Sequence, residues 1–166
     1  QFDKPQTKSF WANSLEDSHF VTTGVSLSRA QIERIAESDN LCERTLEFDS
    51  DFWKALKRWC RKNGVTPPLF FKAMYGLALK NFSNPNMDMC ISDFQNLRGA
   101  GFTNTIANSF SIAPFVFRHS SLFEGDSVKD LLRAMVKEQK RNKGQYFISE
   151  TLFDQLIERE GIGFYY

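Results

Sequence analysis

The fold is decided by the stretch from Met87 to Arg118, which contains Met87-Asp88-Met89-Cys90-Ile91-Ser92 and, further on, Phe110-Ser111-Ile112-Ala113-Pro114-Phe115-Val116-Phe117. Both runs alternate apolar residues with small or polar ones, a pattern typical of strands that bury one face. A turn-forming loop from Arg98 to Asn104 lies between them. Because a two-stranded sheet alone is marginal in water, we expect both strands to belong to a larger sheet, within this chain or shared with another.

The rest of the chain has mainly helical patterns, and all but the first of them begin at a residue suited to capping. Helical spacing of apolar residues predicts helices over residues 8–15, 28–38, 49–62, 66–79, 127–143 and 149–160. The helix from Thr66 is apolar nearly all round between Leu69 and Leu79, so we expect it to be the central buried helix. Residues 44–48 and 163–166 read as further strands. The predicted fold is α/β, an α+β sandwich in which a mixed sheet is covered by helices, with residues 1–166 forming one domain.

Composition and charge exclude several classes of function. The 21 basic and 20 acidic residues give a net charge of +1, which disfavours nucleic acid and anionic membranes as partners. The three cysteines lack the spacing of a disulfide framework or a zinc site, so we expect no metal and a reducing, cytoplasmic setting. No apolar run approaches the ~20 residues that span a bilayer, and the polar start lacks the apolar core of a signal peptide.

Few residues have the spacing of a catalytic motif. The sequence contains no nucleophile elbow, phosphate-binding glycine loop or paired zinc histidines, and we expect His19 and His119 to have surface roles. Cys90 reads as a buried thiol. Arg98 and Arg118 each end a central strand, where an arginine can clamp a loop through paired hydrogen bonds or bind a phosphate.

A basic cluster occupies the end of the helix over residues 127–143. Lys137, Lys140 and Arg141 suit the negative end of a helix dipole and need be no more than a solvated helix end. The alternative is that they dock an acidic protein surface.

Several segments together resemble one family. Lys8 to Leu15 is similar to its "xxFWxxxL" lead-in, and Gly64-Val65-Thr66-Pro67 with the following helix is similar to its "gvTPxxxxxAxxxxL" segment. Asp88 to Arg98 is in step with "DvvvGtPvagR", and Ile106 to Arg118 resembles "iGxFvNTlplR", although Ala107 replaces the glycine and the Asn-Thr pair is absent. The chain therefore resembles the C-terminal lobe of a condensation domain of a nonribosomal peptide synthetase, within the chloramphenicol-acetyltransferase-like superfamily.

The resemblance implies half of an enzyme. In the family, a donor acyl or peptidyl thioester and an acceptor amine, each on the phosphopantetheine arm of a carrier protein, meet in a tunnel between two lobes and form an amide. The active histidine belongs to an HHxxxDG motif of the other lobe. This chain contains no such motif, so we expect it to hold no catalytic residue, to bind no cofactor directly and to be inactive alone.

The resemblance also assigns roles within this lobe. Residues 1–15 would lead in from the N-terminal lobe, which would be the main partner together with carrier proteins docked at Lys137, Lys140 and Arg141. Arg98 and Arg118 would clamp loops, and the tunnel wall would include four polar residues, Asn108, Ser109, Ser111 and Gln145. An exposed lobe face could also drive self-association.

Two other functions stay open at this point. The chain could be a lobe of a related acyltransferase that uses a hydroxyl acceptor, or a non-catalytic domain that docks carrier proteins.

Overall fold

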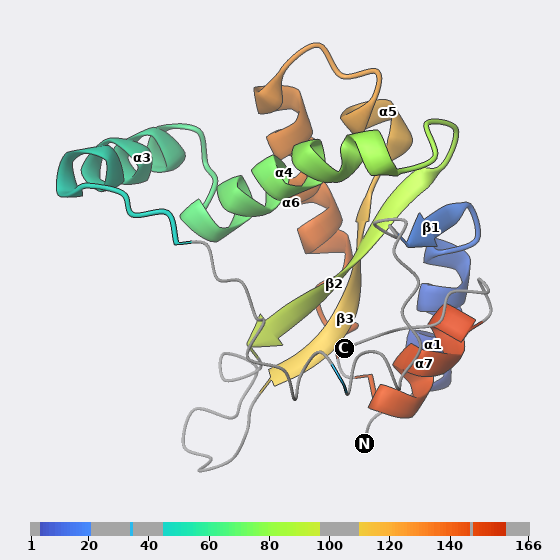
Figure 1. Cartoon of the computed structure of the whole chain (residues 1–166). Helices are drawn as coiled ribbons and strands as arrows, with labels where there is room; N and C mark the ends of the chain where they lie inside the picture. Colours follow the sequence, from blue (N-terminus) through green and yellow to red (C-terminus); the bar gives the residue numbers. More distant parts are fainter. Residues whose placement is uncertain (1–3, 21–33, 35–44, 97–109, 147, 159–166) are drawn as a thin grey trace.

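The computed structural model describes residues 4–20, 34, 45–96, 110–146 and 148–158 of the chain. These ranges form a mixed helix-and-strand fold of the general α/β class, built on a three-stranded mixed sheet (Figure 1). Its helices are α1 (Pro5–Ser14), α3 (Ser50–Lys62), α4 (Pro67–Leu79), α5 (His119–Leu122), α6 (Val128–Arg141) and α7 (Glu150–Glu158), with a 3-10 turn η1 (Lys80–Phe82). The predicted fold class is confirmed at this level.

The sheet has the order β1-β2-β3. β1 (Ser18–Phe20) pairs with β2 (Asp88–Asn96) in parallel, and β2 pairs with β3 (Phe110–Phe117) in antiparallel register. The two strands predicted from the stretch at Met87–Arg118 are therefore neighbours, and the expectation of a larger sheet is met by β1. This strand was not predicted, because three residues carry no periodic signal and its place is defined by pairing with a segment 70 residues away.

Helices cover both faces of the sheet. On one face, α4 and α6 bury Leu69, Ala73, Leu132 and Met135 against alternate residues of β2 and β3, among them Phe115. On the other face, α1 and α7 pack against Cys90 and Val116, and the side chains that fill this layer are Trp11, Leu15, Leu152 and Phe153. Figure 1 shows α1 and α7 together on the side opposite α4 and α6, so the described part of the chain is a three-layer sandwich.

Side-chain caps fix where four of these helices begin. The Phe52 N–H donates to Asp49 Oδ1 at 2.7 Å, and the Leu69 N–H donates to Thr66 Oγ1 at 3.4 Å, ahead of two prolines in the first turn of α4. Ser127 accepts from the Asp130 N–H at 3.3 Å, and Ser149 accepts from the Leu152 N–H at 3.0 Å. Each cap satisfies an N–H that has no partner within its helix, which confirms the helix starts read from the sequence.

Two expectations about secondary structure are wrong. Residues 45–48 form no strand: Leu46 is 76% exposed, and Phe48 stacks on Phe52 of α3 with the ring centroids 4.5 Å apart. Helix α4 is not buried all round, because Tyr75 on its outer side is 55% exposed while Leu69, Ala73 and Gly76 face the core. The predicted strand over residues 163–166 lies outside the described residues, as does the predicted helix over 28–38 apart from Arg34, which is helical.

A glycine sets the distance between α4 and the sheet. Gly76 is buried, and a Cβ built on it would collide with the aromatic ring of Phe117 in β3. The absence of a side chain at this position therefore lets the helix approach the strand closely.

We predict that Gly76→Ala lowers the free energy of unfolding by up to about 2 kcal/mol, because overpacking against Phe117 costs about 1–3 kcal/mol and better helix propensity offsets part of that cost. Helix propensity alone would favour alanine here by about 1 kcal/mol, so the two effects have opposite signs. Urea unfolding of the variant measures the difference. Ala78→Gly, at an exposed position of the same helix, is the control and should cost about 1 kcal/mol. A stabilised Gly76→Ala protein would contradict the close approach.

Candidate functional site

The strongest polar cluster surrounds Arg118, directly after β3. Its Nη1 donates to Asp88 Oδ2 at 2.6 Å, and its Nη2 and Nε donate to the two carboxylate oxygens of Glu138 at 3.2 and 3.4 Å. Asp88 begins β2 and Glu138 lies on α6, so the guanidinium of Arg118, at the junction of β3 and α5, joins a strand to a helix. Asp88 also accepts from the backbone N–H of His119 at 2.6 Å, which fixes the start of α5.

The electrostatics of this cluster suit a fixed ion pair. Burial by itself lowers the pKa of Arg118, but the hydrogen bond to Asp88 and the negative charges of Glu138 and Asp88 outweigh it, so the pKa is raised overall. The Glu138 side chain is only 7% exposed. A carboxylate this buried needs its counter-charge, so these contacts fit the clamp role predicted for Arg118 rather than an arginine held ready for a ligand.

The residues predicted to line a tunnel do not meet in the described part of the chain. Ser111 is buried, and its hydroxyl donates to the backbone oxygen of Ile148 at 3.4 Å. Gln145 instead contacts α1: Thr7 Oγ1 donates to its side-chain oxygen at 3.1 Å, and Trp11 Nε1 donates to its backbone oxygen at 2.9 Å. Asn108, Ser109 and Arg98 lie outside the described residues.

A second polar cluster, which the sequence analysis did not identify, lies on the sheet face that α4 covers. Lys72 of α4 forms an ion pair with Asp93 of β2, and Gln95 donates to the same carboxylate oxygen. The ammonium group of Lys72 also lies over the ring of Phe115, 4.4 Å from its centroid. The sequence does indicate that Asp93 has a cationic partner. The alternation of β2 puts Asp93 on the same face as Met89 and Ile91, which pack in the core, and a charge on that face needs a partner.

The three residues predicted to dock a carrier have different environments. Lys137 and Lys140 are exposed on α6, and no ion pair or hydrogen bond is recorded for either side chain among the described residues. Arg141 is engaged within the fold, since it bonds to Ser14 Oγ, lies 3.6 Å from Glu138 and stacks over the ring of Phe10 at 5.2 Å. Arg141 therefore joins α6 to α1, which leaves Lys137 and Lys140 as the accessible pair.

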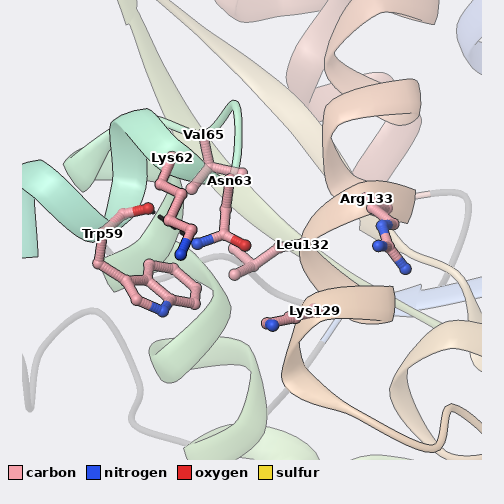
Figure 2. Close-up of a pocket in the computed structure, with 7 residues that line it drawn as sticks. All are labelled: Trp59, Lys62, Asn63, Val65, Lys129, Leu132 and Arg133. Atoms are coloured by element: carbon pink, nitrogen blue, oxygen red, sulfur yellow. Dashed lines mark hydrogen bonds between the residues drawn. The ribbon is translucent and has the colours of Figure 1, made fainter.

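A pocket of about 190 Å³ opens where the end of α3 meets the start of α6. Its walls carry three cations and a ring, and its residues are Trp59, Lys62, Asn63, Val65, Lys129, Leu132 and Arg133. Figure 2 shows the amino groups of Lys62 and Lys129 reaching into the space beside the indole of Trp59 from opposite helices, whereas Arg133 points away. The sequence gives no sign of this pocket, because its two lysines are 67 positions apart.

Positive charge is concentrated on the two helices that meet at this pocket. Helices α3 and α6 together carry ten basic and three acidic residues, a net charge of +7, whereas the whole chain has a net charge of +1. On α6, Lys129, Arg133, Lys137 and Lys140 are all exposed and share one side of the helix, a row called here the basic stripe. The small net charge of the chain therefore hides a strongly positive surface.

Both histidines and the two cysteines in the described ranges, Cys60 and Cys90, have structural surroundings. His19 Nε2 accepts from the backbone N–H of Asn84 at 2.9 Å, and the ring of His119 stacks on Phe123 with centroids 5.3 Å apart. The thiols of Cys60 and Cys90 are buried, and burial raises the pKa of Cys60. Within the described ranges, no group of histidine, cysteine or acidic residues could hold a metal ion, and no helix is long and apolar enough to cross a membrane.

No family model, curated protein or solved structure matches this chain.

We predict that Arg118→Met lowers the free energy of unfolding by about 3 kcal/mol, because Asp88 and Glu138 would stay largely buried without a counter-charge. Arg118→Lys should cost less, since it keeps the charge but loses the paired geometry. Urea unfolding at neutral pH measures both. Arg133→Met, which removes an exposed ion pair within α6, the helix that carries Glu138, is the matched control and should change stability little. Equal effects of Arg118→Met and Arg133→Met would contradict the clamp.

We predict that the stability of the protein declines at alkaline pH because of Tyr146. Burial, with the negative charges of Asp93 and Glu138, raises its pKa from 10.0 to about 12, so the folded protein holds the phenol neutral. Below pH 10 the neutral Tyr146 phenol makes its full contribution to the free energy of unfolding. Between pH 10 and 12 this contribution is lost, because Tyr146 ionises in the unfolded state before it ionises in the folded state. Urea unfolding between pH 8 and 12 should show this decline, which Tyr146→Phe should reduce and Tyr75→Phe, at an exposed site, should leave intact.

Proposed function

We propose that this chain is the C-terminal lobe of an amide-forming condensation domain of the nonribosomal peptide synthetase type, with a chloramphenicol-acetyltransferase-like fold. One observation carries the proposal. Asp88, which begins one segment similar to a family motif, and Arg118, which ends another, are 30 positions apart in the chain and form a 2.6 Å ion pair. Because the two side chains form one ion pair, each motif has a reason to keep its charged residue.

The layered architecture supports the same proposal. In the family the lead-in enters from the other lobe, and here α1 packs on the sheet through Trp11, whose indole N–H is bonded to Gln145. At the far end of the β2–β3 pair, Phe94 and Phe110 contact each other and are 68% and 49% exposed. Exposed rings of this kind suit a face that a partner covers, and we assign that partner to the N-terminal lobe.

In this function the chain positions reactants rather than activating them. A donor thioester and an acceptor amine, each tethered to a carrier, would be held between the two lobes while the other lobe supplies the histidine. Correct positioning of two reactants can remove roughly 7–11 kcal/mol from a barrier, so a lobe without a catalytic side chain can still be essential. Ser111 and Gln145, with Asn108 and Ser109, remain the proposed tunnel residues, and the phosphopantetheine arm remains the proposed substrate carrier.

Carrier docking is assigned to the exposed pair Lys137 and Lys140. Both lie on the basic stripe of α6, where an acidic carrier would gain long-range attraction and faster association. Arg141 contributes less to this surface because it is bonded within the fold. The proposed setting is the cytoplasm.

The test uses the whole two-lobed protein, obtained by joining this chain to the sequence encoded directly upstream of Gln1. We expect it to form an amide between aminoacyl groups loaded on the carrier domains of the same gene, detected by mass spectrometry. Lys137→Gln/Lys140→Gln should raise the KM for the carrier about tenfold with kcat nearly unchanged, and this effect should vanish in high salt. Lys54→Gln, a basic residue of α3, is the control.

Three results would count against the proposal. If no HHxxxDG motif occurs upstream, the chain is no lobe of an active enzyme of this type. If the product is an ester rather than an amide, the chain belongs to a hydroxyl-using acyltransferase. If carriers bind but no product forms with the catalytic histidine present, the protein is a docking domain.

A further inference from the structure

We infer that the pocket between α3 and α6 binds a phosphate monoester. The pocket holds about 190 Å³, enough for a phosphate group with a few attached atoms. Its polar lining is cationic, since Lys62 and Lys129 converge on it from two helices and no acidic side chain lines it (Figure 2). The inference is independent of the proposed function, because it depends only on this pocket and its charges.

The two lysines are available for a ligand. No hydrogen bond or ion pair is recorded for Lys62 or Lys129 among the described residues. The nearby acidic side chain, Asp130, is already engaged by the hydroxyl of Ser127 at 2.6 Å and by Arg133 at 2.8 Å. The Asp130 carboxylate is therefore bonded within its own turn of α6, and among the described residues no hydrogen bond or ion pair joins it to Lys62 or Lys129.

Lys129 occupies an unfavourable place unless an anion binds. It is the second residue of α6, a helix of 14 residues, and the first turn is the positive end of the helix dipole. Acidic residues are favoured there and basic ones are not. Lys62 needs no such explanation, because it lies in the last turn of α3, where a cation is stabilising. A bound dianion would offset the repulsion at Lys129 and pair with both ammonium groups.

The remaining walls favour a phosphate ester over a bare ion. Trp59, Val65 and Leu132 provide an apolar side, so a ligand gains from carrying carbon next to its charged group. Leu132 of α6 is 1% exposed and packs in the core between α6, α4 and the sheet. The site therefore combines a buried apolar wall with two exposed cationic side chains, an arrangement that suits a small phosphate ester.

Two probes test the inference and distinguish the source of the phosphate. Inorganic phosphate represents a free small molecule, and a short phosphoserine peptide represents phosphate on a protein. Binding is followed by the NMR shift of the Trp59 indole N–H, assigned with Trp59→Phe, at constant ionic strength. We expect saturable binding with one site. Tighter binding of the peptide by tenfold or more points to a protein ligand, and equal affinity points to a small molecule.

Variants locate the site. Lys62→Gln and Lys129→Gln should each weaken phosphate binding by about tenfold, because each removes a charge-assisted hydrogen bond. Lys140→Gln removes the same charge from the same helix outside the pocket and should change binding less than twofold. Lys62, Lys129 and Lys140 are all exposed, so the three variants should fold, and far-UV circular dichroism checks this. Absence of binding by both probes, or equal losses in Lys129→Gln and Lys140→Gln, would overturn the inference.

Discussion

The ion-pair cluster of Arg118 is the contact on which the arrangement of the layers depends. Its guanidinium binds Asp88 at the start of β2 and Glu138 on α6 at the point where the chain leaves β3. The backbone N–H of Asp88 is in turn bonded to the oxygen of Asp17, next to β1. The side chain of Arg118 thus fixes one end of the central strand relative to α6, a helix that covers the sheet. Apolar packing supplies most of the stability, but it is non-directional, and a paired guanidinium supplies direction.

Local signals explain which parts of the fold were predictable. The caps at Asp49, Thr66, Ser127 and Ser149 each join residues three positions apart, so sequence alone locates them. The false strand over residues 45–48 shows the limit of the same reasoning. Its alternating pattern is real, but a strand exists only through a partner, and Phe48 stacks on α3 instead. The parallel partner of β2 was missed for the converse reason, since β1 is too short to show a pattern.

The polar sites were less predictable because their partners are distant in sequence. The sequence indicates an anchoring role for Arg118 but does not identify Glu138, 20 positions on, as its partner. The ion pair of Asp93 could be predicted in part. Strand alternation puts Asp93 on a buried face, which implies a cation from a covering helix, and Lys72 is that cation. Lys62 and Lys129 had no such signal, because only the packing of α3 near α6 makes them neighbours.

The basic surface separates into two regions that act independently. Lys129 and Lys140 share one side of α6, and 11 residues of helix put about 16 Å between them. At physiological ionic strength the Debye length is about 8 Å, so each exposed charge acts mainly on its own surroundings. The end with Lys129 faces Lys62 across a pocket, whereas Lys137 and Lys140 have no opposing wall among the pocket-lining residues. A concave site with converging charges selects a small anion, and an open row of charges attracts an extended acidic surface. Because the two regions differ in shape and Lys129 lies more than one screening length from both Lys137 and Lys140, a charge removed at Lys137 or Lys140 should leave the pocket nearly unaffected.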